Sequence, residues 1–382
     1  MTRVAINPDL LDWALVRAGL SADALIKAFP KIHDWLTGEI QPTLKQLESF
    51  ANKTHTAIGY LFLPEPPVET LPIPDFRTLA DRQLAQPSPD LLDTIYAMQQ
   101  RQSWLREDRI ECEAEPLDFV GSATQNDEPE AVGREMRRLA GFEEGWTSSV
   151  ASWRDAVSVL RRAMEMLGIM TVINGVVGNS TNRVLNVEEF RGFALSDPYA
   201  PLIFVNGADA KSAQMFSLAH ELAHIWLGES ALTDVEPASQ PSQQLEVWCN
   251  RAAAEFLVPE VELRLYWHEV RHHQTPFEMI ARHFKVSPIV AGRRAMDLRL
   301  VDRAVFFDFY QEYIKAERKQ QKKTAGGNFY NNQNTRVGEL FATQVIRAAM
   351  EGRVGFREAY NLTGLHGGTF QKYAQRLGFD LP

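Results

Sequence analysis

The chain has 382 residues, which is too long for one ordinary hydrophobic core and predicts two to four folded units. Its hydrophobic content of 45% and charged content of 23% are those of a globular protein, so extensive disorder is excluded. The formal net charge of −9 argues against a surface coated for nucleic acid, although a local basic face remains compatible with it.

The N-terminal residues 1–63 are predicted to form several short helices. "NPDLLDWALVRAG" begins at an asparagine cap and ends at Gly19, and "SADALIKAF" begins at a serine cap. The following segment, 64–87, contains "PEPPVETLPIPDF", whose prolines forbid a helix and indicate an extended linker. Residues 88–149 are expected to be a helical connector.

Residues 150–265 are predicted to form an α+β core. Three short runs with β-type residues, at 168–175, 190–196 and 201–207, suggest a small sheet. A strong helix then ends at Gly228, and a second helix stops at Pro259. The expected fold is therefore a mostly helical chain of several domains with one small sheet.

The remaining chain is predicted to be helical apart from one linker. Residues 266–314 have a sequence pattern like that of a helix-turn-helix. Residues 315–334 contain the charged "KAERKQQKKTAGG" and are expected to be a linker. Residues 335–382 are expected to form a small helical unit that serves packing or a partner. The cysteines, Cys112 and Cys249, lack CxxC spacing, and no apolar run approaches about 18 residues. We therefore expect a soluble, cytoplasmic protein without signal peptide or membrane span.

The stretch "SLAHELAHIWLG" carries the clearest chemical pattern. His220 and His224 are four residues apart, so both imidazoles lie on one helix face and can reach one metal ion. Glu221 follows the first histidine and can act as the general base toward a water molecule, as in the H-E-x-x-H pattern. The alternative is a core helix with two hydrogen-bonded histidines, but His, Glu and His together are costly in an apolar helix.

A third ligand is needed, and several carboxylates compete for the role. The metzincin continuation fails, because Leu227 and Ser230 stand where its glycine and histidine would be. The nearby candidates are Glu229, Asp234, Glu236 and Glu246. Glu246 is favoured because it opens a rigid helix, and Asn250 on the same face can accept the free N–H of a ligating histidine. A solvated glutamate at a helix start is the alternative interpretation of Glu246.

A second electrophile could come from "YWHEVRHHQ". Its candidates are Tyr266, His268, His272 and His273, although a solvated helix end is the favoured interpretation of this segment.

These residues resemble the ImmA/IrrE-type zinc metallopeptidases. The similarity lies in "FRGFALSDPYAPLIFVNGADAKSAQMFSLAHELAHIWLG" and "EVWCNRAAAEFLVP", over roughly residues 150–300; Cys249 and Ala252 replace the family's usual Ala and Phe. The resemblance implies a zincin-like core of the gluzincin H-E-x-x-H type, with a Zn²⁺ cofactor. It implies His220, His224 and Glu246 as zinc ligands and Glu221 as catalytic base.

The segment 1–63 resembles an XRE/Cro-like helix-turn-helix domain, best at Trp35, Gly38 and "QPTLKQLESFA". Its reading element is degenerate, since only Lys31 and His33 could face a DNA groove, so DNA binding is weakly supported and protein contact is as good an expectation. Arg293 and Arg294 in the later helical extension are further candidates for DNA or partner contact, against a helical support with a solvated basic face.

Two functions remain open from the sequence. The first is a zinc endopeptidase that cleaves a regulatory protein, such as a helix-turn-helix repressor, in a stress, mobile-element or phage-response circuit, as the resemblance implies. The second is an antitoxin and transcriptional regulator that binds a cognate toxin, for example a nuclease, and its own promoter, with the peptidase site idle or self-processing. A purely structural zinc is the weakest alternative, because three protein ligands leave an open position.

Overall fold

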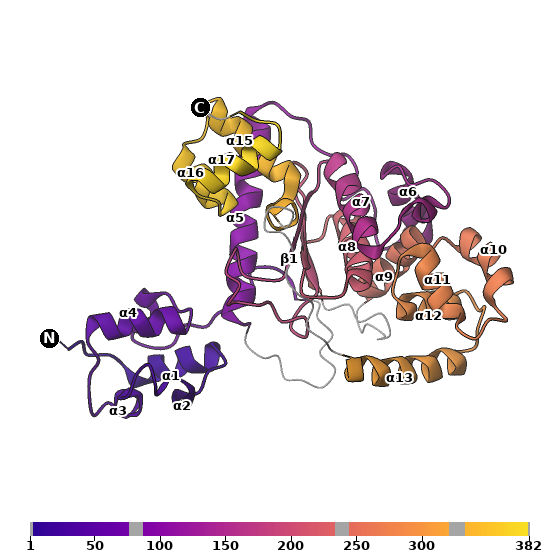
Figure 1. Cartoon of the computed structure of the whole chain (residues 1–382). Helices are drawn as coiled ribbons and strands as arrows, with labels where there is room; N and C mark the ends of the chain where they lie inside the picture. The colour runs from indigo at the N-terminus through magenta and orange to yellow at the C-terminus, as the bar shows by residue number, and fades with distance from the viewer. Residues whose placement is uncertain (1–2, 76–86, 234–243, 321–332, 381–382) are drawn as a thin grey trace. The chain divides into compact units, whose positions relative to one another are not determined.

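A computed structural model describes residues 3–75, 87–233, 244–320 and 333–380 (Figure 1). Contacts divide the chain into two units, Met1–Pro72 with Leu79–Tyr96 and Ile73–Thr78 with Ala97–Pro382. The second unit is mostly helical around one small sheet, so the predicted α+β class is confirmed. Within the described ranges, no helix has the length and hydropathy needed to cross a bilayer.

The first unit is a set of short helices, as predicted. They are α1 (Pro8–Arg17), α2 (Ala22–Leu25), α3 (Ile32–Leu36), α4 (Leu44–Lys53) and the 3₁₀ helix η1 (Ile58–Phe62). Asn7 caps α1 through the backbone N–H of Asp9, and Thr43 and Gln46 form a capping box at α4. Trp35 and Phe50 are buried at the centre of its apolar core. The helix expected to read DNA, α3, is only five residues long.

The sheet of the second unit has the strand order β1-β3-β2-β4. Its strands are β1 (Met170–Asn174), β2 (Gly192–Leu195), β3 (Leu202–Asn206) and β4 (Ala231–Thr233). β1 runs parallel to β3, whereas β2 is antiparallel to both β3 and β4. The first three strands lie in the predicted runs. β4 was not predicted, because three residues between a glycine-ended helix and a polar segment carry no period-2 signal.

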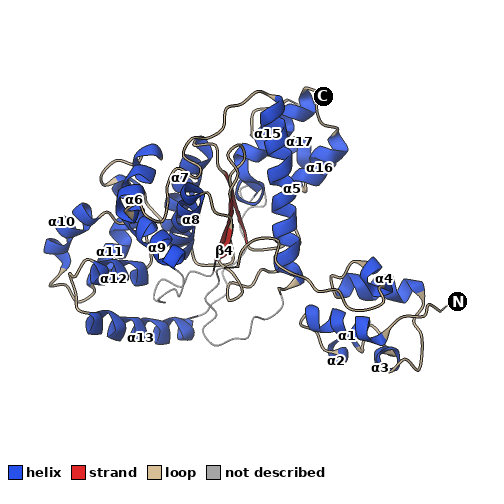
Figure 2. Cartoon of the chain, turned by 180° about the vertical axis from the view of Figure 1, so that it is seen from behind, coloured by secondary structure: helices blue, strands red, loops and turns tan. Residues whose placement is uncertain are grey.

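Helices cover both sides of this sheet (Figures 1 and 2). On one side, α7 (Trp153–Met166) packs on β1, and α8 (Lys211–Leu227) packs on β2 and β3. Behind α8 lie α6 (Pro129–Leu139) and α9 (Gln244–Leu257), which pack tightly against each other. The further helices are η2 (Trp146–Ser149), α10 (Glu260–Val270), α11 (Pro276–Phe284), α12 (Pro288–Asp297) and α13 (Arg303–Gln320).

Helix α13 extends into the segment that was expected to be a linker. The prediction placed residues 315–334 outside any helix, but α13 continues to Gln320. Lys, Ala, Glu, Arg and Gln dominate its end, and all are good helix formers. The rest of that expected linker, up to residue 332, lies outside the described residues.

The C-terminal helices belong to the second unit and lie at its β1 edge. They comprise the π-helix η3 (Asn334–Gly338), α15 (Glu339–Met350), α16 (Phe356–Thr363) and α17 (Gly367–Arg376). η3 and α15 contact β1. Helix α5 (Pro89–Glu111) joins this group to the core: Arg101 donates to the carbonyls of Arg336 and Leu362, and Gln102 donates to those of Leu195 and Ala200.

Glu165 connects the C-terminal helices to α7 and predicts a pH-dependent stability. Its carboxylate pairs with Arg161 and accepts the backbone N–H of Glu339 at 2.9 Å. Burial raises the pKa of Glu165 from 4.5 to about 7. The native state therefore binds more protons than the unfolded state between these values, so the free energy of unfolding falls as the pH rises through this interval. Below about pH 4.5 this contribution is fully present, and by about pH 7 it is lost.

We expect Glu165→Gln to remove the contribution of Glu165 to this pH dependence, which amounts to about 3 kcal/mol. Urea unfolding at pH 5 and pH 7.5 measures it. Glu135→Gln is the control, because Glu135 is exposed and pairs only at the surface with Arg138. An equal decline in wild type and Glu165→Gln would contradict this account of Glu165.

Candidate metal centre

Helix α8 places two histidines on one side of a buried helix. His220 and His224 are one turn apart, and neither is accessible to solvent. The helix ends at Gly228, whose φ of +72° favours glycine and where a Cβ atom would lie only 3.0 Å from Cα of Gly121. The two imidazole Nε2 atoms lie 3.1 Å apart and therefore face the same point.

Helix α9 brings a carboxylate to that point. Glu246 Oε2 is 3.1 Å from His220 Nε2, and Glu246 Oε1 is 3.2 Å from His224 Nε2. One ligand atom from each of the three residues lies within 4.8 Å of the others. Of the competing carboxylates, Glu229 is exposed, whereas Asp234 and Glu236 lie outside the described residues. The structure thus brings Glu246 together with both histidines.

Asn250 orients the first histidine. Its Oδ1 is 3.0 Å from Nδ1 of His220, one helical turn beyond Glu246 on α9. An Oδ1 acceptor holds a proton on Nδ1, so Nε2 is the nitrogen of His220 that faces Glu246 and His224 and is available to a metal ion. This is the contact that the sequence predicted for Asn250.

The charge states of the three donor residues favour the binding of a cation. Burial opposes the charged form of each group. At Glu246 it is outweighed by His220 and His224, which lower the pKa of the carboxyl to about 2. At His220 burial is outweighed by Glu246, so the pKa is raised, whereas burial lowers the pKa of His224. A deprotonated carboxylate and neutral imidazoles are the forms that bind metal, and two nitrogens with one oxygen suit zinc.

Glu221 lies beside the donors but is turned toward the sheet. Its Oε1 accepts a hydrogen bond from the hydroxyl of Thr233 on β4. Its Oε2 is buried and has no hydrogen-bond partner in the part of the chain that the structure describes. Burial raises the pKa of Glu221 to about 8, more than His220 and Thr233 lower it. A carboxyl with a pKa near neutrality can both take up and release a proton.

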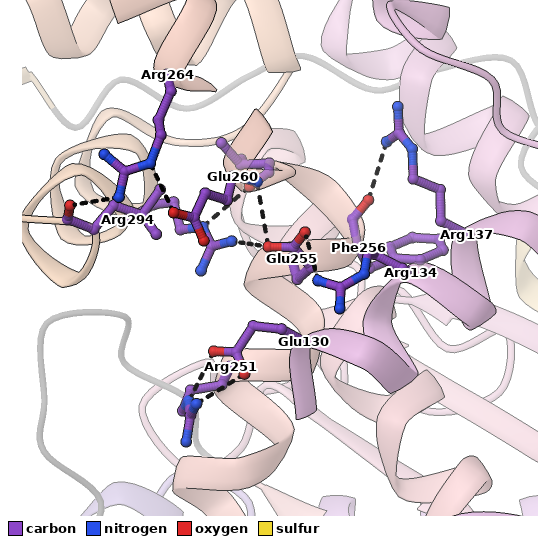
Figure 3. Close-up of polar contacts among 11 residues, drawn as sticks. Glu130, Arg134, Arg137, Arg251, Glu255, Phe256, Glu260, Arg264 and Arg294 are labelled. Atoms are coloured by element: carbon purple, nitrogen blue, oxygen red, sulfur yellow. Dashed lines mark hydrogen bonds and ion pairs between the residues drawn. The ribbon is translucent and has the colours of Figure 1, made fainter. Parts of the chain in front are cut away.

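Helix α9 is held as a rigid platform by α6 and α12. A Cβ on Gly133 of α6 would lie 2.5 Å from the carbonyl oxygen of Ala252, so the two helices touch through their backbones. Figure 3 shows Glu255 of α9 between Arg294 and Arg134, and a second ion pair between Arg251 and Glu130. The candidate ligand Glu246 and its neighbour Asn250 are therefore carried on a helix that cannot shift freely.

Arg294 differs from its predicted place. The sequence suggested an exposed cation for DNA or a partner, but Arg294 is 3% exposed, pairs with Glu255 and donates to the carbonyl of Val258. The guanidinium forms its contacts inside the fold, because the face of α12 that carries Arg294 is turned toward the C-terminal end of α9. Its neighbour Arg293 is half-buried and pairs with Asp297 on the same helix.

The other predicted contact residues lie apart from the three donors in their described contacts. Tyr266 stacks on His283 of α11 at 4.0 Å, and His268 is exposed on α10. In the first unit, Lys31 is exposed, and the ring of His33 is 3.0 Å from the carboxylate of Asp23. Thr233 and Gly192, which contact Glu221, were not singled out from the sequence, because their role depends on the pairing of β2 and β4.

The comparison with known families agrees with this geometry. Residues 168–296 match the family model described as the IrrE N-terminal-like domain, Peptidase_M78. This range covers about a third of the chain and contains the sheet, α8 and α9 with all three donors. The resemblance stated for the peptidase part is thereby confirmed. Residues 337–376 match a domain of unknown function, DUF8813, and no curated protein matches the chain.

Proposed function

We propose that this protein is a zinc-dependent endopeptidase. The observation that carries the proposal is the convergence of His220, His224 and Glu246 beside Glu221, inside the range that matches Peptidase_M78. Three buried donors with the carboxylate of Glu221 beside them form the arrangement of a catalytic zinc site. A structural zinc site would have four protein ligands.

The chain's own residues supply the binding and the proton transfer. When bound, zinc acts as a Lewis acid that polarises a carbonyl group and lowers the pKa of water. His220, with its Nδ1–H held by Asn250, and His224 would bind the ion through Nε2, and Glu246 would bind it through its carboxylate. Glu221 takes the proton from the attacking water at Oε2, its free oxygen, and later passes it to the departing amine.

Removal of one ligand tests the metal site directly. Glu246→Gln keeps the size of the side chain but removes the anionic ligand, so we expect zinc affinity to fall by more than about 100-fold. Glu229→Gln is the control, because Glu229 is an exposed glutamate just beyond the end of α8, the helix that carries both histidines. Zinc content measured by mass spectrometry checks both. Equal zinc content in the two variants would contradict the assignment of Glu246.

The substrate we propose is a regulatory protein, such as a helix-turn-helix repressor, and the first unit is proposed to contact it. Residues 1–72 carry six Lys and Arg against eight Asp and Glu, a balance that disfavours phosphate neutralisation. The short α3, with exposed Lys31 and His33, offers few groups to read base edges. Both observations support protein contact over DNA contact for this XRE-like unit.

Profiling of new protein N-termini tests the activity without a known substrate. We expect zinc-loaded wild type, added to extract of the host cell, to create a small set of new N-termini. Stripping the metal with a chelator should abolish these cuts, and restoring zinc should restore them. Cuts that persist unchanged in the metal-free protein would exclude zinc-dependent cleavage.

A second candidate, a toxin-binding regulator with an idle peptidase site, is supported by one observation. His220, Glu221 and His224 are fully buried, and Glu246 is only 3% exposed, so a polypeptide reaches the donors only after a rearrangement. Under this alternative, the wild type retains the product of an adjacent toxin gene on purification and shifts its own promoter DNA. If neither binding is observed, the regulator alternative fails.

A further inference from the structure

We infer that Thr233 and Gly192 form a seat that positions the carboxylate of Glu221, and this inference rests on the proposed peptidase function. The two residues are register partners on the antiparallel pair β2 and β4. Both lie against Glu221 of α8, which packs over this part of the sheet. Neither is a metal ligand, so their role is to hold the group that moves the proton.

Thr233 supplies the directed contact. It is fully buried, and its hydroxyl donates to Oε1 of Glu221, with the carbonyl oxygen of Gly192 farther away at 3.3 Å. A hydroxyl has one proton to donate, and a carboxylate is the stronger acceptor, so the hydrogen bond goes to Glu221. Because Oε1 is held, Oε2 is the oxygen left free for the proton of the reacting water.

Gly192 supplies the space. A Cβ at this position would lie 2.8 Å from Oε1 of Glu221 and 3.0 Å from the carbonyl oxygen of Phe204. The strand cannot move aside, because Gly192 pairs with Val205 on one side and Thr233 on the other. The absence of a side chain therefore allows Glu221 to reach the sheet, and any larger residue pushes its carboxylate away from Thr233.

The short strand β4 is itself held in place from both sides. The backbone N–H of Arg191 donates to the carbonyl of Thr233 at 3.2 Å, and the N–H of Leu232 donates to the carbonyl of Pro74 at 2.9 Å. Thr233 thus stands on a strand fixed between β2 and the proline-rich segment. A hydroxyl on such a fixed strand restricts the rotation of Glu221 more than a hydroxyl on a free loop does.

The experiment uses zinc-loaded full-length protein and acetohydroxamate. This compound chelates zinc and carries N–H and O–H groups that can donate to an acceptor beside the metal, and we expect Glu221 to accept from it through Oε2. Calorimetry compares the wild type with Thr233→Val, which keeps the branched shape but lacks the hydroxyl, and with Thr233→Ser, which restores it. Gly192→Ala tests the space, and Thr171→Val is the matched control, since Thr171 is a buried threonine on β1 whose hydroxyl bonds the carbonyl of Ile169.

We expect zinc content to be equal in all these proteins. Hydroxamate affinity should fall by about 10- to 100-fold in Thr233→Val and Gly192→Ala, with Thr233→Ser within about threefold of the wild type and Thr171→Val unchanged. On a cleaved substrate, the same two variants should lose kcat by a similar factor with KM unchanged, because Thr233 is fully buried and acts through Glu221. If Thr233 and Gly192 only stabilised the fold, their variants would contain less zinc, or Thr171→Val would lose as much hydroxamate affinity as they do.

Equal hydroxamate affinity of Thr233→Val and wild type overturns the inference and leaves the proposed peptidase function standing. A zinc-loaded wild type that binds hydroxamate with the expected dependence on Thr233 but cleaves no protein overturns the proposed function and supports the seat. Loss of hydroxamate affinity in Thr233→Ser as large as in Thr233→Val also overturns the inference, because the hydroxyl would then not be the cause.

Discussion

Glu221→Gln is expected to lower kcat on a protein substrate by about 10²- to 10⁴-fold while zinc content stays at the wild-type value. Glutamine has the same shape as glutamate and can still accept the hydrogen bond of Thr233 through its amide oxygen. It cannot hold a proton, so both the activation of water and the protonation of the departing amine are lost. Glu221 is not among the three donors, so metal binding should persist.

The measurement is the initial rate of cleavage of one substrate found by N-terminal profiling, at equal zinc loading. Glu229→Gln serves as control for a generic loss of negative charge near the site, since Glu229 is exposed. Equal rates for Glu221→Gln and wild type would exclude Glu221 as the base. A rate loss that is accompanied by zinc loss would instead place Glu221 among the ligands.

The second large effect is expected on stability, from a residue remote from the metal donors. Arg294→Met should lower the free energy of unfolding by about 3–5 kcal/mol, because it leaves the buried carboxylate of Glu255 without its main cation. Arg134 is a weaker substitute, since its nearest nitrogen is 3.5 Å from Glu255 and its side chain is 55% exposed. Glu255 lies near the C-terminal end of α9, the helix that also contains Glu246, so we expect zinc affinity to fall as well.

Arg293→Met is the matched control for this prediction. It changes the adjacent arginine, whose ion pair with Asp297 is partly exposed. We expect it to lower the free energy of unfolding by less than about 0.5 kcal/mol. The double variant Glu255→Leu/Arg294→Met should recover part of the lost stability, because apolar residues can replace a buried ion pair. Urea unfolding of the four proteins measures these differences. Similar losses for Arg293→Met and Arg294→Met would contradict the buried pair.

The cluster of candidate metal donors could be predicted from the sequence because its geometry is local to two helices. The spacing of His220 and His224 on one helix determines that both imidazoles share a face. Glu246 and Asn250 have the same spacing on the next helix, so a ligand and its orienting partner come together as a pair. The choice of Glu246 over Glu229 followed from its place on a rigid helix and from Asn250 on the same helix face.

The sequence by itself therefore determined the α+β class, the first three strands, the two site helices and the identity of the candidate donors, because each depends on residues within one or two turns. The tertiary structure alone decided what depends on pairing across the chain. It placed Arg294 in a buried ion pair with Glu255, 39 residues away, and set Thr233 against Glu221 through the pairing of β4 with β2. A local pattern records which side chains share a face of one element, whereas the neighbour that such a face meets is set by packing between elements distant in the chain.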